Sequence, residues 1–189
     1  MGLRVLSYRM RLLLCNLRAH RAFGVVAGIG ALLLTTACSA EVVGLAGVSV
    51  DERGDPIAVV VACKGTYDAA HLEDVSNLDA TTLNIVRDWS FSAVRMMRWN
   101  IVESPAATHA KPGGTLVVKP GVPYQLTTFS KADQTTSGSV TFTAADLAGL
   151  RPGQVRYFNK NESGGTGDHV VVDATKFESL ACDQIAGLS

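Results

Sequence analysis

The chain has 189 residues, of which 17 are basic and 17 acidic, so its formal net charge is zero. This balance conceals a strong asymmetry, because no acidic residue precedes Glu41. Five arginines lie in the same stretch: Arg4, Arg9, Arg11, Arg18 and Arg21. Without them, 12 basic residues face 17 acidic ones, a net charge of about −5. The remaining Lys and Arg are scattered singly, which excludes the basic patch of a nucleic-acid-binding protein.

The N-terminal segment has the pattern of an export signal. An apolar run from Phe23 to Leu34 follows the arginines and contains Gly24, Gly28 and Gly30. It is shorter than the roughly 20 residues that a membrane-spanning helix needs. We therefore predict that residues 1–37 form a signal peptide that is removed, rather than a permanent membrane span.

The end of this segment, Thr35-Thr36-Ala37-Cys38, resembles the bacterial lipobox, in which a small residue precedes a cysteine that is diacylated. Ala37 and Cys38 fit that motif, whereas Thr35 stands where it usually has Leu. The resemblance implies a lipid anchor at Cys38 that holds the protein at the extracytoplasmic face of the cell membrane. Cleavage after Ala37 and secretion of a soluble protein is the alternative. Residues 38–44 are predicted to be a short tether that keeps the folded part near the membrane.

Of the four cysteines, only two are expected to remain as thiols in the exported chain. Cys15 leaves with the signal and Cys38 carries the lipid, so Cys63 and Cys182 remain. In an oxidising compartment such a pair predicts a disulfide. The alternative is two separately buried free thiols.

The first elements after the tether read as strands. Val48–Val50, a polar turn and Ile57–Cys63 predict a hairpin whose second arm is apolar on both faces and therefore central in a sheet. Residues 65–82 are either an irregular connection or a short helix near 69–75. Alternating polar and apolar residues then predict further strands over 83–92, 94–102, 124–129 and 140–142.

The C-terminal part mixes helix and strand signals. Thr143 to Asp146 has the Ser/Thr-x-x-Asp/Glu pattern of a helix start, with Gly149 and Pro152 ending a short helix. Residues 155–158 and 169–172 predict a hairpin around a glycine-rich turn. The pattern of a helix start recurs at Thr175 to Glu178, before Cys182.

Seven or eight short strands in about 150 residues predict one antiparallel β-sandwich domain, spanning residues 45–189. Residues 118–124 and 150–157 both resemble the Pro-Gly…Tyr corner of immunoglobulin and fibronectin type III domains, where the tyrosine hydroxyl bonds the backbone; the second has one extra residue. The resemblance implies an immunoglobulin-like fold. Residues 137–155 are also similar to a stretch of uncharacterised bacterial lipoproteins, which implies no particular activity.

Residues with catalytic or metal-binding chemistry do not form a signature. His71, His109 and His169 are far apart in the sequence and no free cysteine pair remains, so we predict no metal site and no cofactor. Gly-x-Ser-x-Gly and His-Glu-x-x-His motifs are absent, so no catalytic residue is assigned. The glycine-rich residues 163–169 could bind an anion through backbone amides, but they lack the Lys-Ser/Thr of a P-loop and favour a plain turn. Asp168 and His169 are adjacent on a strand, so they point to opposite faces and pair poorly.

Large apolar residues near two arginines offer a different kind of site. Trp89, Trp99, Met96 and Met97 lie near Arg95 and Arg98 and could form a recognition patch for a partner protein or a sugar. Core packing is the alternative, which alternation favours for Trp89.

The function expected from the sequence is therefore that of a non-enzymatic, lipid-anchored module that binds a partner protein at the envelope surface or has a structural role there. Two alternatives stay open. The first is a carrier of a small apolar ligand or lipid, which an interior cavity would favour. The second is a hydrolase whose site is assembled only by the fold.

Overall fold

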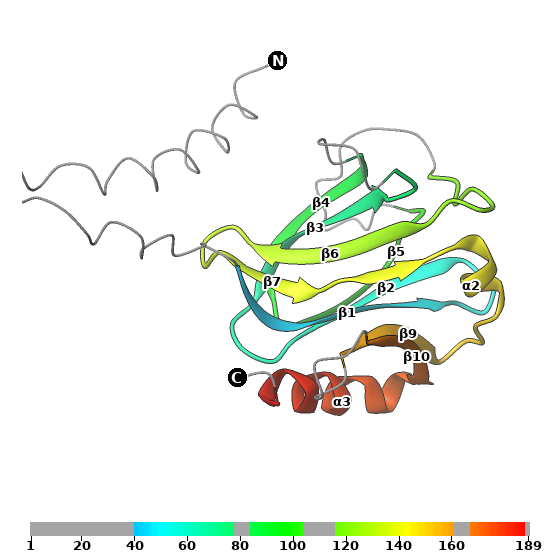
Figure 1. Cartoon of the computed structure of the whole chain (residues 1–189). Coiled ribbons are helices and arrows are strands. Elements are labelled where there is room, and N and C mark those ends of the chain that lie inside the picture. The colour runs from blue at the N-terminus through cyan, green and yellow to red at the C-terminus, as the bar shows by residue number, and fades with distance from the viewer. Residues whose placement is uncertain (1–39, 78–83, 104–115, 161–166, 188–189) are drawn as a thin grey trace, which may run out of the picture. The chain divides into compact units, whose positions relative to one another are not determined.

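The computed structural model describes residues 40–77, 84–103, 116–160 and 167–187. Within these ranges ten strands and two helices follow one another (Figure 1). The strands are β1 (Glu41–Val50), β2 (Pro56–Ala62), β3 (Tyr67–Asp74), β4 (Ile85–Val94), β5 (Met96–Asn100), β6 (Tyr124–Ser130), β7 (Thr135–Gly138), β8 (Val140–Phe142), β9 (Gln154–Asn159) and β10 (Asp168–Asp173). The helices are α2 (Ala144–Ala148) and α3 (Ala174–Ala186).

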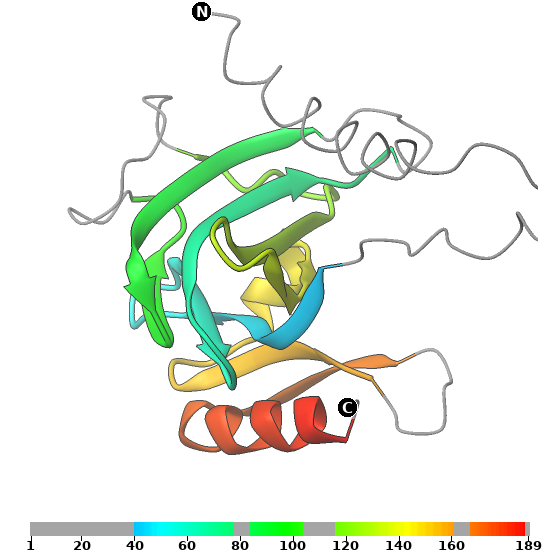
Figure 2. The same cartoon turned by 90° about the vertical axis from the view of Figure 1, so that its left-hand side faces the viewer.

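These strands form one mixed sheet that nearly closes into a barrel, so the predicted immunoglobulin-like β-sandwich is wrong. One path through the sheet is β10-β9-β1-β7-β6-β3-β4, and β2 joins β1 to β5. Only Arg95 separates β4 from β5, and this bend carries the sheet from the β3 side to the β2 side. Figure 2 shows the strands curving around a common interior, with α3 outside it beneath β9 and β10.

The sheet divides at β1. The first half of β1 pairs with β7 in parallel, from Glu41 to Leu45, and Gly47 and Val48 then pair with β9 in antiparallel. The chain of β7 continues through Ser139 into β8, which stays beside β6. A parallel pair between the first strand and one almost a hundred residues later is the feature that a sandwich of successive hairpins does not contain.

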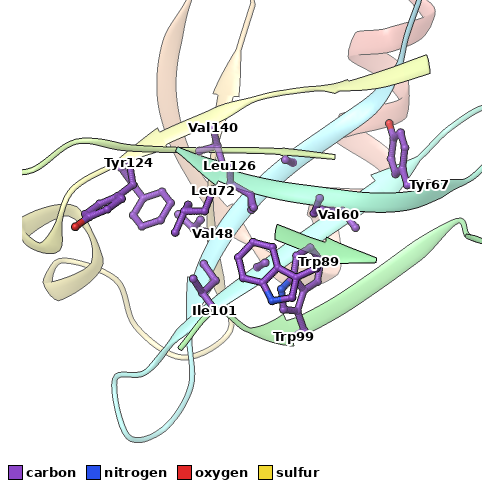
Figure 3. Packing of buried hydrophobic residues seen from close by; sticks show 14 of the residues in the cluster. Val48, Val60, Tyr67, Leu72, Trp89, Trp99, Ile101, Tyr124, Leu126 and Val140 are labelled. Carbon is purple, nitrogen blue, oxygen red and sulfur yellow. The ribbon is translucent and has the colours of Figure 1, made fainter. Parts of the chain in front are cut away.

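Side chains fill the interior of the barrel (Figure 3). The largest fully buried ones come from most of the strands: Trp89, Tyr67, Phe142, Leu72, Ile101, Leu126, Val48, Val60 and Val140. The rings of Trp89 and Trp99 meet edge to face with centroids 5.6 Å apart, which joins β4 to β5 beyond their shared bend. Aromatic pairs of this geometry stabilise a core beyond the area they bury.

Helix α3 covers the outer face of β1 and β2. Phe177, Ala181 and Ile185 of α3 are buried against Leu45 and other residues of the outer face. The outer and inner clusters together bury both faces of β2, which confirms the central strand predicted for residues 57–63. The predicted disulfide is also confirmed: Cys63 and Cys182 are bonded, with Cα atoms 5.2 Å apart, and fasten α3 to the end of β2.

The region left open as irregular or helical is a strand, since β3 covers Tyr67–Asp74. Ala70 and Leu72 belong to the inner cluster, and the small Ala70 lies directly opposite Trp89 of β4. Tertiary packing here overrides the low strand propensity of Asp and Ala. The other predicted strands, the hairpin of β9 and β10 and both helices are present, although α3 begins at Ala174 with Asp173 as its N-cap. Strand β1 starts at Glu41, inside the range predicted to be tether.

One expected corner is present despite the different fold. The backbone N–H of Lys119 donates to the Tyr124 hydroxyl at 3.2 Å, as in a tyrosine corner. Tyr157, the other corner tyrosine, packs edge-on against Phe177 of α3.

Candidate functional site

An apolar hollow of about 420 Å³ lies at the end of β1 opposite Ala40. Four segments line it: the β1–β2 turn at Gly54 and Pro56, Val102 after β5, residues 116–118, and α2. In Figure 1 α2 lies beside the ends of β1 and β2, across the length of β1 from the start of the strand. A ten-residue strand spans about 30 Å, so the hollow is remote from the point where the chain enters the barrel.

The hairpin tip forms a rigid wall of the hollow. The Asp51 carboxylate accepts hydrogen bonds from the backbone N–H groups of Arg53, at 2.8 Å, and Asp55, at 2.9 Å. Gly54 has φ +83°, a left-handed conformation that glycine adopts without strain. These hydrogen bonds from two backbone amides lower the pKa of the Asp51 carboxyl group, and the bond from Asp55 has the larger effect, so the side chain stays charged.

Two further walls are held by side chains that bond to the backbone. The Asn100 carbonyl oxygen accepts from the N–H groups of Val102, at 2.8 Å, and Glu103, at 3.0 Å, which fixes the turn after β5. The bond from Lys119 to Tyr124 holds the end of the segment that carries Val117. Val117 is 67% exposed, the most exposed large hydrophobic residue of the described chain.

Helix α2 supplies the last wall. Its start is closed by a capping box in which Thr143 Oγ1 accepts from the Asp146 N–H and the Asp146 carboxylate accepts from the Thr143 N–H. Ala144 and Ala148 face the hollow together with Leu147. Because alanine has only a methyl side chain, this face of the helix leaves the space open.

The hairpin side of the hollow is acidic. Asp51, Glu52 and Asp55 lie in the turn and Glu103 follows Val102, against one cation, Arg53. Arg53 reaches Asp55 at 3.0 Å, Asp51 at 3.5 Å and Glu103 at 3.9 Å. Lys119 follows the lining residue Val118, and its charge helps to lower the pKa of Asp74, after two hydrogen bonds from Ser76. Among the described residues, the hollow is therefore apolar at its floor and negative along one edge.

The structure separates the histidines that the sequence singled out. His71 lies in β3, where its Nε2 is 2.8 Å from a Glu73 carboxylate oxygen, and His169 lies in β10. Cys38, His109 and residues 163–166 of the glycine-rich stretch lie outside the described residues. In the part that is described, no three His, Cys, Asp or Glu side chains are grouped as metal ligands.

A second polar cluster surrounds His169. Its Nε2 accepts from the Thr141 N–H at 3.3 Å. Arg156 is nearby and forms an ion pair with Asp146 at 3.3 Å. Burial, followed by the positive charge of Arg156, lowers the His169 pKa, while Asp146 and Asp168 oppose this. This hydrogen bond at Nε2 holds the imidazole against the backbone of β8, which no longer pairs with β1. The side chain of His169 therefore has a structural role.

The proposed recognition patch of tryptophan and methionine is divided between core and surface. Trp89 and Trp99 are 1% and 3% exposed and belong to the core, whereas Met96 is 47% exposed and Met97 packs partly against the core. The indoles are therefore not available to a partner. No helix within the described ranges is both long and apolar enough to cross a membrane.

Comparison of the chain with protein-family models, with curated proteins and with solved structures finds no match.

The residues of the hollow were not predicted from the sequence. They come from four segments between Gly54 and Ala148, and none carries a motif. The one available signal was the apolar run Leu116-Val117-Val118 directly before Lys119-Pro120-Gly121, a run too short to form a buried strand.

Proposed function

We propose that the protein is an exported, non-enzymatic binding module, anchored by lipid at Cys38 to the extracytoplasmic face of the membrane. The observation that carries this proposal is the position of the apolar hollow, about 30 Å along β1 from the residue where the tether enters. On a chain anchored at Cys38, a surface at that end of β1 would be open to partners beyond the membrane surface.

The disulfide supports the export part of the proposal. A bond between Cys63 and Cys182 forms and persists in oxidising compartments, and it is rare in the cytoplasm. The packed interior weighs against the carrier alternative, because Trp89, Trp99 and Leu126 occupy the space that an apolar ligand would need.

Intact mass and membrane fractionation test the proposal. The natural chain and Cys38→Ala are expressed in a lipoprotein-processing bacterium, with Ser39→Ala as the matched control. We expect the natural chain and Ser39→Ala to begin at a diacylated Cys38 and to remain with the membrane, and Cys38→Ala to lose both the added mass and the membrane association. An unlipidated natural chain in the medium would instead identify a secreted protein.

A further inference from the structure

We propose that the hollow beside α2 binds a segment of a partner protein in which an apolar side chain is flanked by lysine or arginine. The inference rests on the proposed function, since it names the partner of the same surface. The occupant follows from two properties of the site, its apolar floor and its negative edge.

The floor selects for an apolar group of limited size. Val102, Val117 and Leu147 supply branched aliphatic surface, while Gly54, Ala144 and Ala148 leave the space between them. The volume of about 420 Å³ exceeds one aliphatic side chain and suits one or two together with their backbone. Transfer of such a group from water contributes a favourable free energy in proportion to the apolar area buried.

The edge selects for positive charge. Among the described residues, three carboxylates lie within 4 Å of the Arg53 guanidinium: Asp51, Asp55 and Glu103. The Glu103 side chain is 68% exposed and its carboxylate lies 3.9 Å from Arg53, so much of its surface is open to a second cation. The negative potential at Asp55 and Glu103 would attract a lysine or arginine of the partner and would repel an acidic segment.

The walls are already in their binding conformation. The bonds from Asp51, Asn100 and Thr143 hold three of the four segments without any partner. A site fixed in this way loses little conformational entropy when it is filled, which favours binding of a short segment.

The test uses three acetylated ten-residue peptides and the ¹⁵N-labelled protein, purified with its disulfide formed as the exporting host processes it. One peptide alternates Leu and Lys, the second Leu and Glu, and the third Ser and Lys. We expect only the Leu–Lys peptide to shift the amide signals of Val102, Val117 and Leu147. Its binding should weaken as salt rises from about 20 mM to about 300 mM, because exposed charges are screened.

Variants separate the edge from the rest of the surface. Asp55→Asn combined with Glu103→Gln should raise the dissociation constant of the Leu–Lys peptide about threefold or more. Glu178→Gln on α3 removes the same kind of charge outside the site and should leave the dissociation constant unchanged. The amide spectrum of each free variant reports whether it is folded.

Several results would overturn the inference. These are equal binding of the Leu–Glu peptide, shifts confined to other parts of the barrel, or no shift at about 1 mM peptide. Shifts of the same amides by phosphatidylcholine vesicles and not by the peptide would assign the hollow to lipid. None of these outcomes depends on whether Cys38 is acylated, so the inference and the proposed function fail separately.

Discussion

The imidazole of His169 accepts the backbone N–H of Thr141 at 3.3 Å, and so replaces a strand-to-strand hydrogen bond where β8 has separated from β1. An imidazole can accept at Nε2 only while that nitrogen is unprotonated. The bond therefore ties the junction of β8 and β10 to the charge state of one side chain.

The first prediction concerns pH. Burial and Arg156 hold the pKa of His169 below its usual 6.5, so the unfolded chain takes up a proton that the folded chain resists. The free energy of unfolding should be constant above about pH 6.5 and fall as the pH drops toward 5. Urea unfolding at a series of pH values measures this dependence. In His169→Gln the fall over this range should be smaller, and an unchanged fall would show that His169 is not its source.

The second prediction concerns the disulfide. Cys63 and Cys182 are 119 residues apart, so replacing both by alanine should lower the free energy of unfolding by about 5 kcal/mol in the chain-entropy model. Urea unfolding of the variant and of the oxidised natural chain gives the difference. The natural chain measured in excess reductant should match the variant. Equal stability of the oxidised and reduced natural chain would show that the bond contributes nothing.

The third prediction compares two glycines. A Cβ on Gly44 would overlap the Val61 carbonyl oxygen and the Tyr67 hydroxyl, so Gly44→Ala should cost about 3 kcal/mol or more. A Cβ on Gly54 meets nothing within 4 Å, and only its φ of +83° is unfavourable. Gly54→Ala should therefore cost roughly 1–2 kcal/mol. Thermal unfolding of both variants decides this order, and the reverse order would contradict the close approach at Gly44.

The fourth prediction concerns the wall of the hollow that α2 forms. Thr143→Ala removes the cap of this helix and should lower stability by about 1 kcal/mol, while Thr143→Ser, which keeps the hydroxyl, should retain most of it. The variant should also weaken binding of the Leu–Lys peptide, because Leu147 loses its fixed position. Unchanged stability and binding would mean that packing alone holds α2.

Much of the local structure follows from the sequence. The hairpin of β1 and β2, the capping box at Thr143 and the bond at Tyr124 are each determined by residues close together in the chain. In each case the local sequence pattern contains the residues that make the interactions, and each feature is present in the fold. The pairing of Cys63 with Cys182 is a long-range feature that could also be predicted, because the other two cysteines were assigned to the signal peptide and to the lipid anchor.

The closure of the sheet could not be predicted in this way. Alternation reports that a strand has one buried face, and the strands of a sandwich and of a barrel share that property. The bend at Arg95 and the parallel pairing of β1 with β7 decide between them, and neither leaves a local pattern. The hollow escaped prediction for the same reason, because only the finished fold brings Pro56, Val102 and Leu147 together.

The three-way pairing of β1 also sets the order in which the fold can be completed. Strand β1 comes first in the chain, yet its partners β7 and β9 lie at 135–138 and 154–159, and its outer face is covered by α3. The hairpin of β1 and β2 is local, but the other edge of β1 has no partner until residues 135–159 are available. The barrel and the disulfide at Cys182 can therefore be completed only after most of the chain is available, and such long-range pairing is slow to form.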